Sequence, residues 1–224
     1  MEQRTYKREK ADRKQIERKL HQRFILCGLF ALLVVPGGTV ALAGRDNALY
    51  YSLSAIGNAA GNRLALVLWT LGSSGFFMYA VRLLLWMCRR QDSLAKPLMD
   101  LAAGLLVLCN LLPFTPAELP RLAQYHNFLA TAGSCLLALS LLILVIDLRG
   151  FDRGVGRKSA GLLALIGVSG GLPFFFFGVS GMLEAVCIVL VCLFLFFTMM
   201  LVLMSNAHDS MLIGEEGGEQ MQNR

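Results

Sequence analysis

The sequence predicts an all-α, polytopic integral membrane protein with six transmembrane helices and both termini in the cytoplasm. The chain has 224 residues, of which 56% are hydrophobic and only 16% charged, whereas soluble domains carry about 25% charged residues. The charges gather in short clusters and leave long uncharged runs. Helices of about 20 such residues cross a hydrocarbon core of roughly 30 Å.

Residues 1–23 form a basic tail with nine Lys or Arg residues against four acids. The tail either lies on anionic lipid headgroups or is a solvated segment that only fixes orientation, and its thin apolar face favours the second interpretation. The first span is predicted at 24–43, with a kink at Pro36-Gly37-Gly38. A cleaved signal peptide ending near Ala43 is the alternative, but the apolar stretch is longer than such peptides usually have.

The other five spans follow from the remaining apolar runs. They are predicted at 64–87, 98–112, 128–148, 159–177 and 182–204. Gly167 and Gly171 in the fifth have the GxxxG spacing that allows close packing of membrane helices. The acidic residues 205–224 are expected to form a disordered cytoplasmic tail.

The distribution of Lys and Arg sets the orientation. With a cytoplasmic N-terminus, the inner segments, including the loops 89–97 and 149–158, hold 17 of the 21 Lys and Arg residues, and the outer segments hold three. Inner loops of membrane proteins carry this excess, so we expect a multi-pass protein of the cell (cytoplasmic) membrane. The remaining cation, Arg82, lies within a span and is predicted to pair with Asp147, an acid at a helix C-terminus that needs a positive partner.

Six candidate ligand-binding residues gather at the predicted external face. They are Asn62, Arg63, Glu118, Arg121, His126 and Glu184. The histidine titrates near neutral pH and could accept a proton, with Glu118 or Glu184 as its partner. The alternative is that these side chains simply meet headgroups and water at the ends of helices.

Motifs for catalysis and metal binding are missing from the sequence. The six cysteines fall in apolar runs without a CxxC pair, which is typical of small packing residues. There is no HExxH, GxSxG, P-loop or GxGxxG motif. We therefore assign no catalytic residue and expect no metal, no cofactor and no nucleic-acid partner.

Several segments resemble a known family. They are Ser52-Leu-Ser-Ala-Ile-Gly57, the opening Asn62-Arg-Leu, Leu112-Pro-Phe114, and His126 at the start of the fourth span. Together they are similar to the bacterial six-span proteins of domain-of-unknown-function 998, whose layout is related to the DRAM-like and FGF-receptor-activating-protein-like membrane families. The resemblance covers roughly residues 24–204. It maps the family pattern onto Ser54, Gly57, Asn62, Pro113 and His126, lacks the acid expected near Ala55, and implies no established reaction.

The leading functional hypothesis is a non-enzymatic membrane protein that binds or organises lipid or serves as an accessory subunit. Its expected partners are membrane lipids, with anionic headgroups near the basic tail, and a protein partner or a second copy of the chain. The first alternative is a transporter of small solutes or lipids with an external polar vestibule. The second is an intramembrane enzyme that uses His126 as a base.

Overall fold

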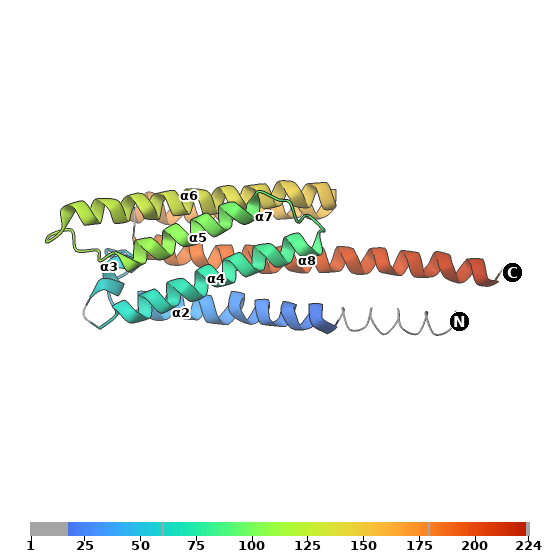
Figure 1. The fold of residues 1–224 in the computed structure, drawn as a ribbon, viewed down its shortest axis with the longest axis horizontal. Helices are drawn as coiled ribbons and strands as arrows, with labels where there is room; N and C mark the ends of the chain where they lie inside the picture. Colours follow the sequence, from blue (N-terminus) through green and yellow to red (C-terminus); the bar gives the residue numbers. More distant parts are fainter. Residues whose placement is uncertain (1–17, 60, 179, 223–224) are drawn as a thin grey trace.

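The protein is an elongated bundle of helices that run back and forth along one axis (Figure 1). The computed structural model describes residues 18–59, 61–178 and 180–222. Its long helices are residues 18–43, α4 (Arg63–Met87), α5 (Ala95–Leu111), α6 (Pro120–Phe151), α7 (Arg153–Phe177) and α8 (Gly181–Gln222). The described residues contain no strand, so the all-α prediction is confirmed.

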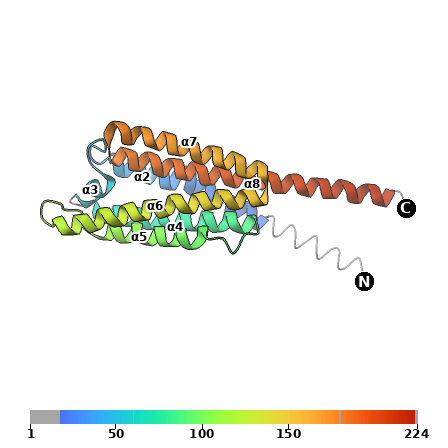
Figure 2. The same ribbon diagram turned by 90° about the horizontal axis from the view of Figure 1, so that it is seen from above.

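The long helices form a closed circuit in which each packs against its neighbours. Helix 18–43 contacts α4 and α8, and the circuit continues through α5, α6 and α7 back to α8 (Figure 2). The two helices α4 and α8 also touch across the bundle. Their fully buried side chains, including Leu84, Phe194 and Leu195, supply much of the core.

Five of these helices are long and apolar enough to cross a membrane, within the part of the chain that the structure describes. They are Arg18–Ala43, Arg63–Met87, Pro120–Phe151, Arg153–Phe176 and Gly181–Asn206. Many large apolar side chains point outward from them, as lipid-facing residues do. These helices indicate a multi-pass membrane protein. The sixth long helix, α5, has only 17 residues, a length of about 25 Å at 1.5 Å per residue.

The predicted kink in the first span takes the form of a π-helical stretch. This stretch, η1 (Phe30–Val34), directly precedes α2 (Val35–Ala43), and Pro36 lies in the first turn of α2. The Val35 N–H donates to the Phe30 carbonyl five residues back. Proline lacks an N–H and its ring crowds the carbonyl four residues before it, and one wider turn relieves this conflict without breaking the helix.

The predicted inner loop 149–158 is replaced by a sharp turn at one residue, Asp152. This carboxylate caps α7 by accepting the Gly154 N–H at 2.6 Å and the Val155 N–H at 3.2 Å. A Cβ at Gly156 would lie 2.3 Å from the Arg149 Cγ atom, so glycine is required where α6 and α7 meet. Aspartate is a favoured N-cap, and here it makes a long loop unnecessary.

Both terminal boundaries differ from the prediction. The described part of the first helix starts at Arg18, inside the predicted basic tail, and the prediction for residues 1–17 lies outside the described residues. At the other end α8 continues past Met204 to Gln222. The acidic tail that was predicted to be disordered is therefore helical up to that residue.

The predicted ion pair between Arg82 and Asp147 does not form. Arg82 instead pairs with Asp100, with 2.7 Å between the Nη2 and Oδ2 atoms, and Asp147 accepts a hydrogen bond from the Ser93 hydroxyl. The reason is the order of helices in the bundle. Arg82 lies on α4, which packs against α5, whereas Asp147 lies on α6, behind α5.

Candidate functional site

Most of the candidate residues lie at one end of the bundle, where the connections before α4, α6 and α8 meet (Figure 1). We call this the polar end and define it by residues 44–59, 61–63, 110–126 and 180–184. The opposite end carries the turns at residues 88–94 and at Asp152. The polar end therefore corresponds to the predicted external face.

A short helix, α3 (Leu53–Asn58), organises the polar end. The Ser52 hydroxyl oxygen caps it by accepting the Ala55 N–H at 3.2 Å, a common way to satisfy a free amide in the first turn of a helix. Gly57 allows α3 to press against α4, because a Cβ at that position would lie 2.6–2.8 Å from side-chain atoms of the buried Leu66. The position of α3 therefore depends on the close contact between Gly57 and Leu66.

Glu184 links α3 to the start of α8. Its carboxylate accepts the Leu53 N–H at 2.9 Å, and two backbone bonds run alongside it. The Gly181 N–H donates to the Tyr51 carbonyl, and the Met182 N–H donates to the Ala48 carbonyl, both at 2.9 Å. A side chain at Gly181 would collide with Tyr51, because its Cβ would lie 2.6 Å from that carbonyl oxygen. Three hydrogen bonds thus hold the segment between α2 and α3, and the start of α3, against α8.

Asn62 and Arg63 make a second set of structural contacts. Arg45 donates to the Asn62 side-chain oxygen at 2.5 Å, and the Asn62 amide donates to the Ile56 carbonyl at 3.2 Å. Arg63 donates to the Leu111 carbonyl at 2.8 Å. The bonds from Asn62 and Arg63 go to backbone carbonyls at the ends of α3 and α5. They tie α3 to the start of α4, and α4 to the end of α5.

His126 is buried beneath the loop that joins α5 to α6, with 2% of its surface exposed. Its ring lies 4.9 Å from the ring of Phe114, between centroids, and faces the backbone of Cys109 and Leu112. Its Nδ1 atom has no hydrogen-bond partner among the described residues. The Cys109 thiol donates to the His126 carbonyl at 3.4 Å. The histidine is thus a packed interior residue between α5 and α6.

The six candidate residues are not assembled around one vestibule. Glu118 and Arg121 have exposed side chains on the loop and at the start of α6. Within the described part of the chain, no hydrogen bond joins His126 to Glu118 or Glu184, and no group of three His, Cys, Asp or Glu residues is placed to hold a metal ion. The acid–base pair considered for His126 is therefore absent from this geometry.

Sequence reasoning missed several residues that build the polar end. Arg45 bridges to Asn62, and the Ser54 hydroxyl donates to the Asn110 side-chain oxygen at 3.2 Å. The serine at position 52, three residues before the amide that it caps, is a recognisable helix-start signal. The partners of Arg45 and Ser54 lie 17 and 56 residues away, and no local pattern indicates them.

The comparisons with known proteins find no relative. No family model matches the chain, and neither a curated protein nor a solved structure is significantly similar to it. The class of the protein follows from its own helices: it is an all-helical, multi-pass membrane protein. The resemblance to the family of domain-of-unknown-function 998 stays a prediction.

Helix α7 is the least covered span of the bundle. Only 12% of the residues in its most apolar stretch are buried, against 28–44% for the other four spans. Leu165, Val168 and Leu172 are more than half exposed. Gly167 and Gly171 have open space around them, so the GxxxG spacing is not used in packing within the chain. This face of α7 is available to whatever surrounds the bundle.

Proposed function

We propose that this chain is a non-enzymatic, six-span protein of the cell membrane that acts through its contacts with lipid, either alone or as an accessory subunit. One observation carries the proposal. The polar residues best suited to a reaction or a transport site, above all Glu184, are used to close one end of the bundle. The surface left uncovered is instead the apolar face of α7.

The path of the chain supports six crossings with both termini on the cytoplasmic side. Helix α5 runs between α4 and α6, antiparallel to both, so helix 18–43 starts at the same end of the bundle at which α8 leaves it (Figure 1). That end carries the basic residues Arg89, Arg90, Arg153 and Lys158, in agreement with the rule that positive loops stay inside.

The orientation is tested by fusing a reporter of membrane sidedness after Asp92 or after Ala117. We expect the first fusion to report the cytoplasm and the second the external side, because α5 lies between the two positions. If both fusions report the same side, α5 does not cross the membrane and the six-span topology is wrong.

The lipid hypothesis is tested by native mass spectrometry of the protein released from nanodiscs of mixed phospholipids. We expect the wild type to retain lipid, and His126→Ala and Glu184→Gln to retain the same lipids in the same proportions, because neither residue lies on the outer surface of α7. Loss of a specific adduct in His126→Ala would instead make the polar end a ligand site. A wild type that retains no lipid would remove the support for a lipid-related function.

A transporter is the second candidate, and it rests on the unpartnered Nδ1 atom of the buried His126. A buried nitrogen without a partner costs free energy, and a polar solute could supply that partner. Uptake of a solute into liposomes that His126→Ala abolishes would favour transport. Identical leakage in the wild type and His126→Ala, independent of the solute, would exclude His126 from a role in transport. Turnover of a lipid substrate that depends on His126 would favour the enzyme.

A further inference from the structure

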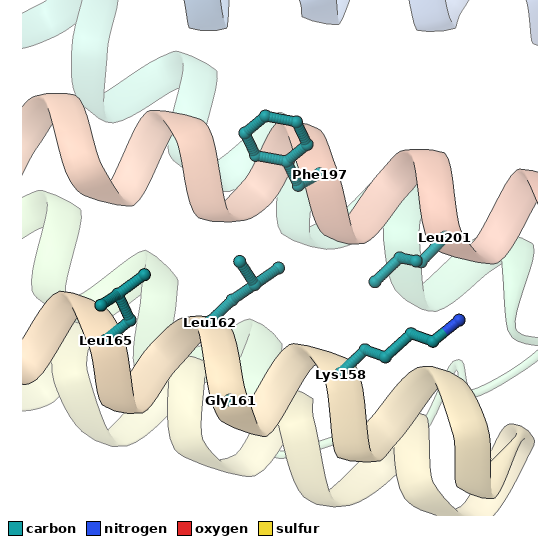
Figure 3. A pocket seen from close by; sticks show the side chains of 6 residues that line it. All are labelled: Lys158, Gly161, Leu162, Leu165, Phe197 and Leu201. Atoms are coloured by element: carbon teal, nitrogen blue, oxygen red, sulfur yellow. The ribbon is translucent and has the colours of Figure 1, made fainter.

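An open groove runs between α7 and α8 toward the end of the bundle opposite the polar end (Figure 3). Its volume is about 470 Å³, within the range of ligand sites in proteins. We call it the α7–α8 groove. Its lining residues are Lys158, Gly161, Leu162 and Leu165 of α7, and Phe197 and Leu201 of α8.

The groove is apolar except at one end. Leu162 and Leu165 project from α7 toward α8, and Phe197 and Leu201 border the groove on the other side (Figure 3). Lys158 extends along α7 beside Leu201, with its ammonium group at the far end of the row (Figure 3). The groove therefore combines an apolar channel with a single cation at its end.

The missing side chain of Gly161 keeps the groove open. A Cβ at this position would meet no atom within 4 Å, so the position is not constrained by packing within the chain. Glycine costs about 0.5–1 kcal/mol relative to alanine in a helix interior. An occupant from outside the chain would fill the space that Gly161 leaves.

The charge of Lys158 is available to such an occupant. Among the residues up to Asn206 whose side chains the structure describes, Lys158 forms no salt bridge, and the salt bridge present joins Arg82 and Asp100. The pKa of the nearby Asp152 is lowered first by the Ser205 hydroxyl and least by the charge of Lys158. The nearby acid, Asp152, is held by the Gly154 and Val155 N–H groups and by the Ser205 hydroxyl, which donates to it at 2.7 Å.

We propose that the α7–α8 groove binds an anionic phospholipid, with an acyl chain along Leu162, Leu165 and Phe197 and the phosphate at Lys158. Three features favour this occupant over a soluble one. The groove opens from the side of two membrane-spanning helices, its walls are aliphatic and aromatic, and its one charged group lies where a lysine reaches the headgroup region. Anionic lipid is also enriched in the cytoplasmic leaflet, on the side proposed for this end. The inference rests on the proposed lipid-related function and names the lipid class and its site.

The test is a titration of the full-length protein in nanodiscs of phosphatidylcholine with increasing phosphatidylglycerol, read by native mass spectrometry. Lys158→Gln removes the phosphate contact, and Arg157→Gln removes the same charge from the neighbouring position outside the groove. Gly161→Leu fills the groove, and Gly167→Leu places the same side chain on an exposed face of α7 that has equally open space. The helical content of each variant is checked by circular dichroism.

We expect wild type, Arg157→Gln and Gly167→Leu to retain phosphatidylglycerol equally. Lys158→Gln should bind it roughly five-fold more weakly, the effect of one cation at a lipid surface. Gly161→Leu should lose both lipids from this site. Should Gly161→Leu fail to fold, the comparison of Lys158→Gln with Arg157→Gln still tests whether the groove binds the lipid phosphate.

Three results would overturn the inference. Equal lipid retention by wild type, Lys158→Gln and Gly161→Leu would remove the groove as the site while leaving a lipid-related function standing. Retention of no lipid by any of these proteins would contradict both proposals. Binding of inorganic phosphate in lipid-free detergent that depends on Lys158 and is unaffected by Gly161→Leu would identify an anion site in place of a lipid site.

Discussion

The contact between Glu184 and α3 gives the sharpest prediction about the polar end. Glu184→Ala removes the acceptor of the Leu53 N–H, and Leu53 is 2% exposed. The amide would be left without its partner in a buried place. Leaving a buried donor without its hydrogen-bond partner costs about 1–3 kcal/mol. The bonds from Gly181 and Met182 remain, so the effect should be a local opening and not loss of the fold.

The assay is hydrogen–deuterium exchange of the protein in detergent micelles, followed on peptides that cover residues 48–58. Because each 1.4 kcal/mol is a factor of ten in an equilibrium constant, exchange of the Leu53 amide should speed up by roughly 5- to 140-fold in Glu184→Ala. Glu184→Gln keeps an oxygen acceptor in the same place and should show a much smaller increase. Peptides from α6 should be unchanged in both variants and serve as the internal control.

Two outcomes would refute this reasoning. Unchanged exchange in Glu184→Ala would mean that the carboxylate does not hold α3. Equal acceleration in Glu184→Gln and Glu184→Ala would mean that the charge, and not the hydrogen-bond acceptor, is what matters. The second outcome would make Glu184 a candidate for a transport site again.

Three further predictions concern packing and charge. Gly57→Ala should destabilise the protein by about 1–3 kcal/mol because its Cβ would overlap a buried leucine. Gly72→Ala should be neutral or stabilising because the space around Gly72 is open. Thermal unfolding compares the two variants, and an equal loss of stability in both would contradict the packing of α3 against α4. A double-mutant cycle on Arg82 and Asp100 should give a coupling free energy of only about 0.2–1 kcal/mol, because the two side chains are 53% and 36% exposed. A coupling free energy of zero would mean that this ion pair does not stabilise the protein. The pKa of Asp152 lies below its usual range, because a serine hydroxyl of α8 and then two N–H groups of α7 stabilise the carboxylate. Its contribution to stability is therefore present above the ordinary pKa of about 3.9 and lost as the pH falls below it, so the melting temperature of the wild type should drop more steeply in acid than that of Asp152→Asn, and parallel pH profiles would contradict this.

The sequence predicts the spanning helices well because long apolar runs have one stable arrangement in a bilayer. The run predicted at 64–87 corresponds to Arg63–Met87 in the structure, since charges bound it on both sides. Boundaries fail where a polar stretch can also be helical. Residues 149–158 were expected to form a loop, but Asp152 caps α7 at once and shortens the connection to a single residue.

The contacts of the candidate site depend on which helices are neighbours in the bundle. No local pattern in the sequence predicts that arrangement. The Glu184 carboxylate meets an amide 131 residues away, and Arg82 selects Asp100 because α4 packs against α5. The polar character of each residue was visible in the sequence, but not the partner that each one has. The α7–α8 groove likewise depends on two helices and on one glycine that leaves space between them.

Mapping where lipid touches the protein tests directly whether the α7–α8 groove is a lipid site. An anionic phospholipid with a photoreactive group in its acyl chain is incorporated into nanodiscs, crosslinked, and located by peptide mass spectrometry. We expect crosslinks concentrated on residues 158–165 and 197–201, and fewer of them in Lys158→Gln. Crosslinks spread evenly around the bundle, or gathered on residues 110–126 at the polar end, would contradict this expectation.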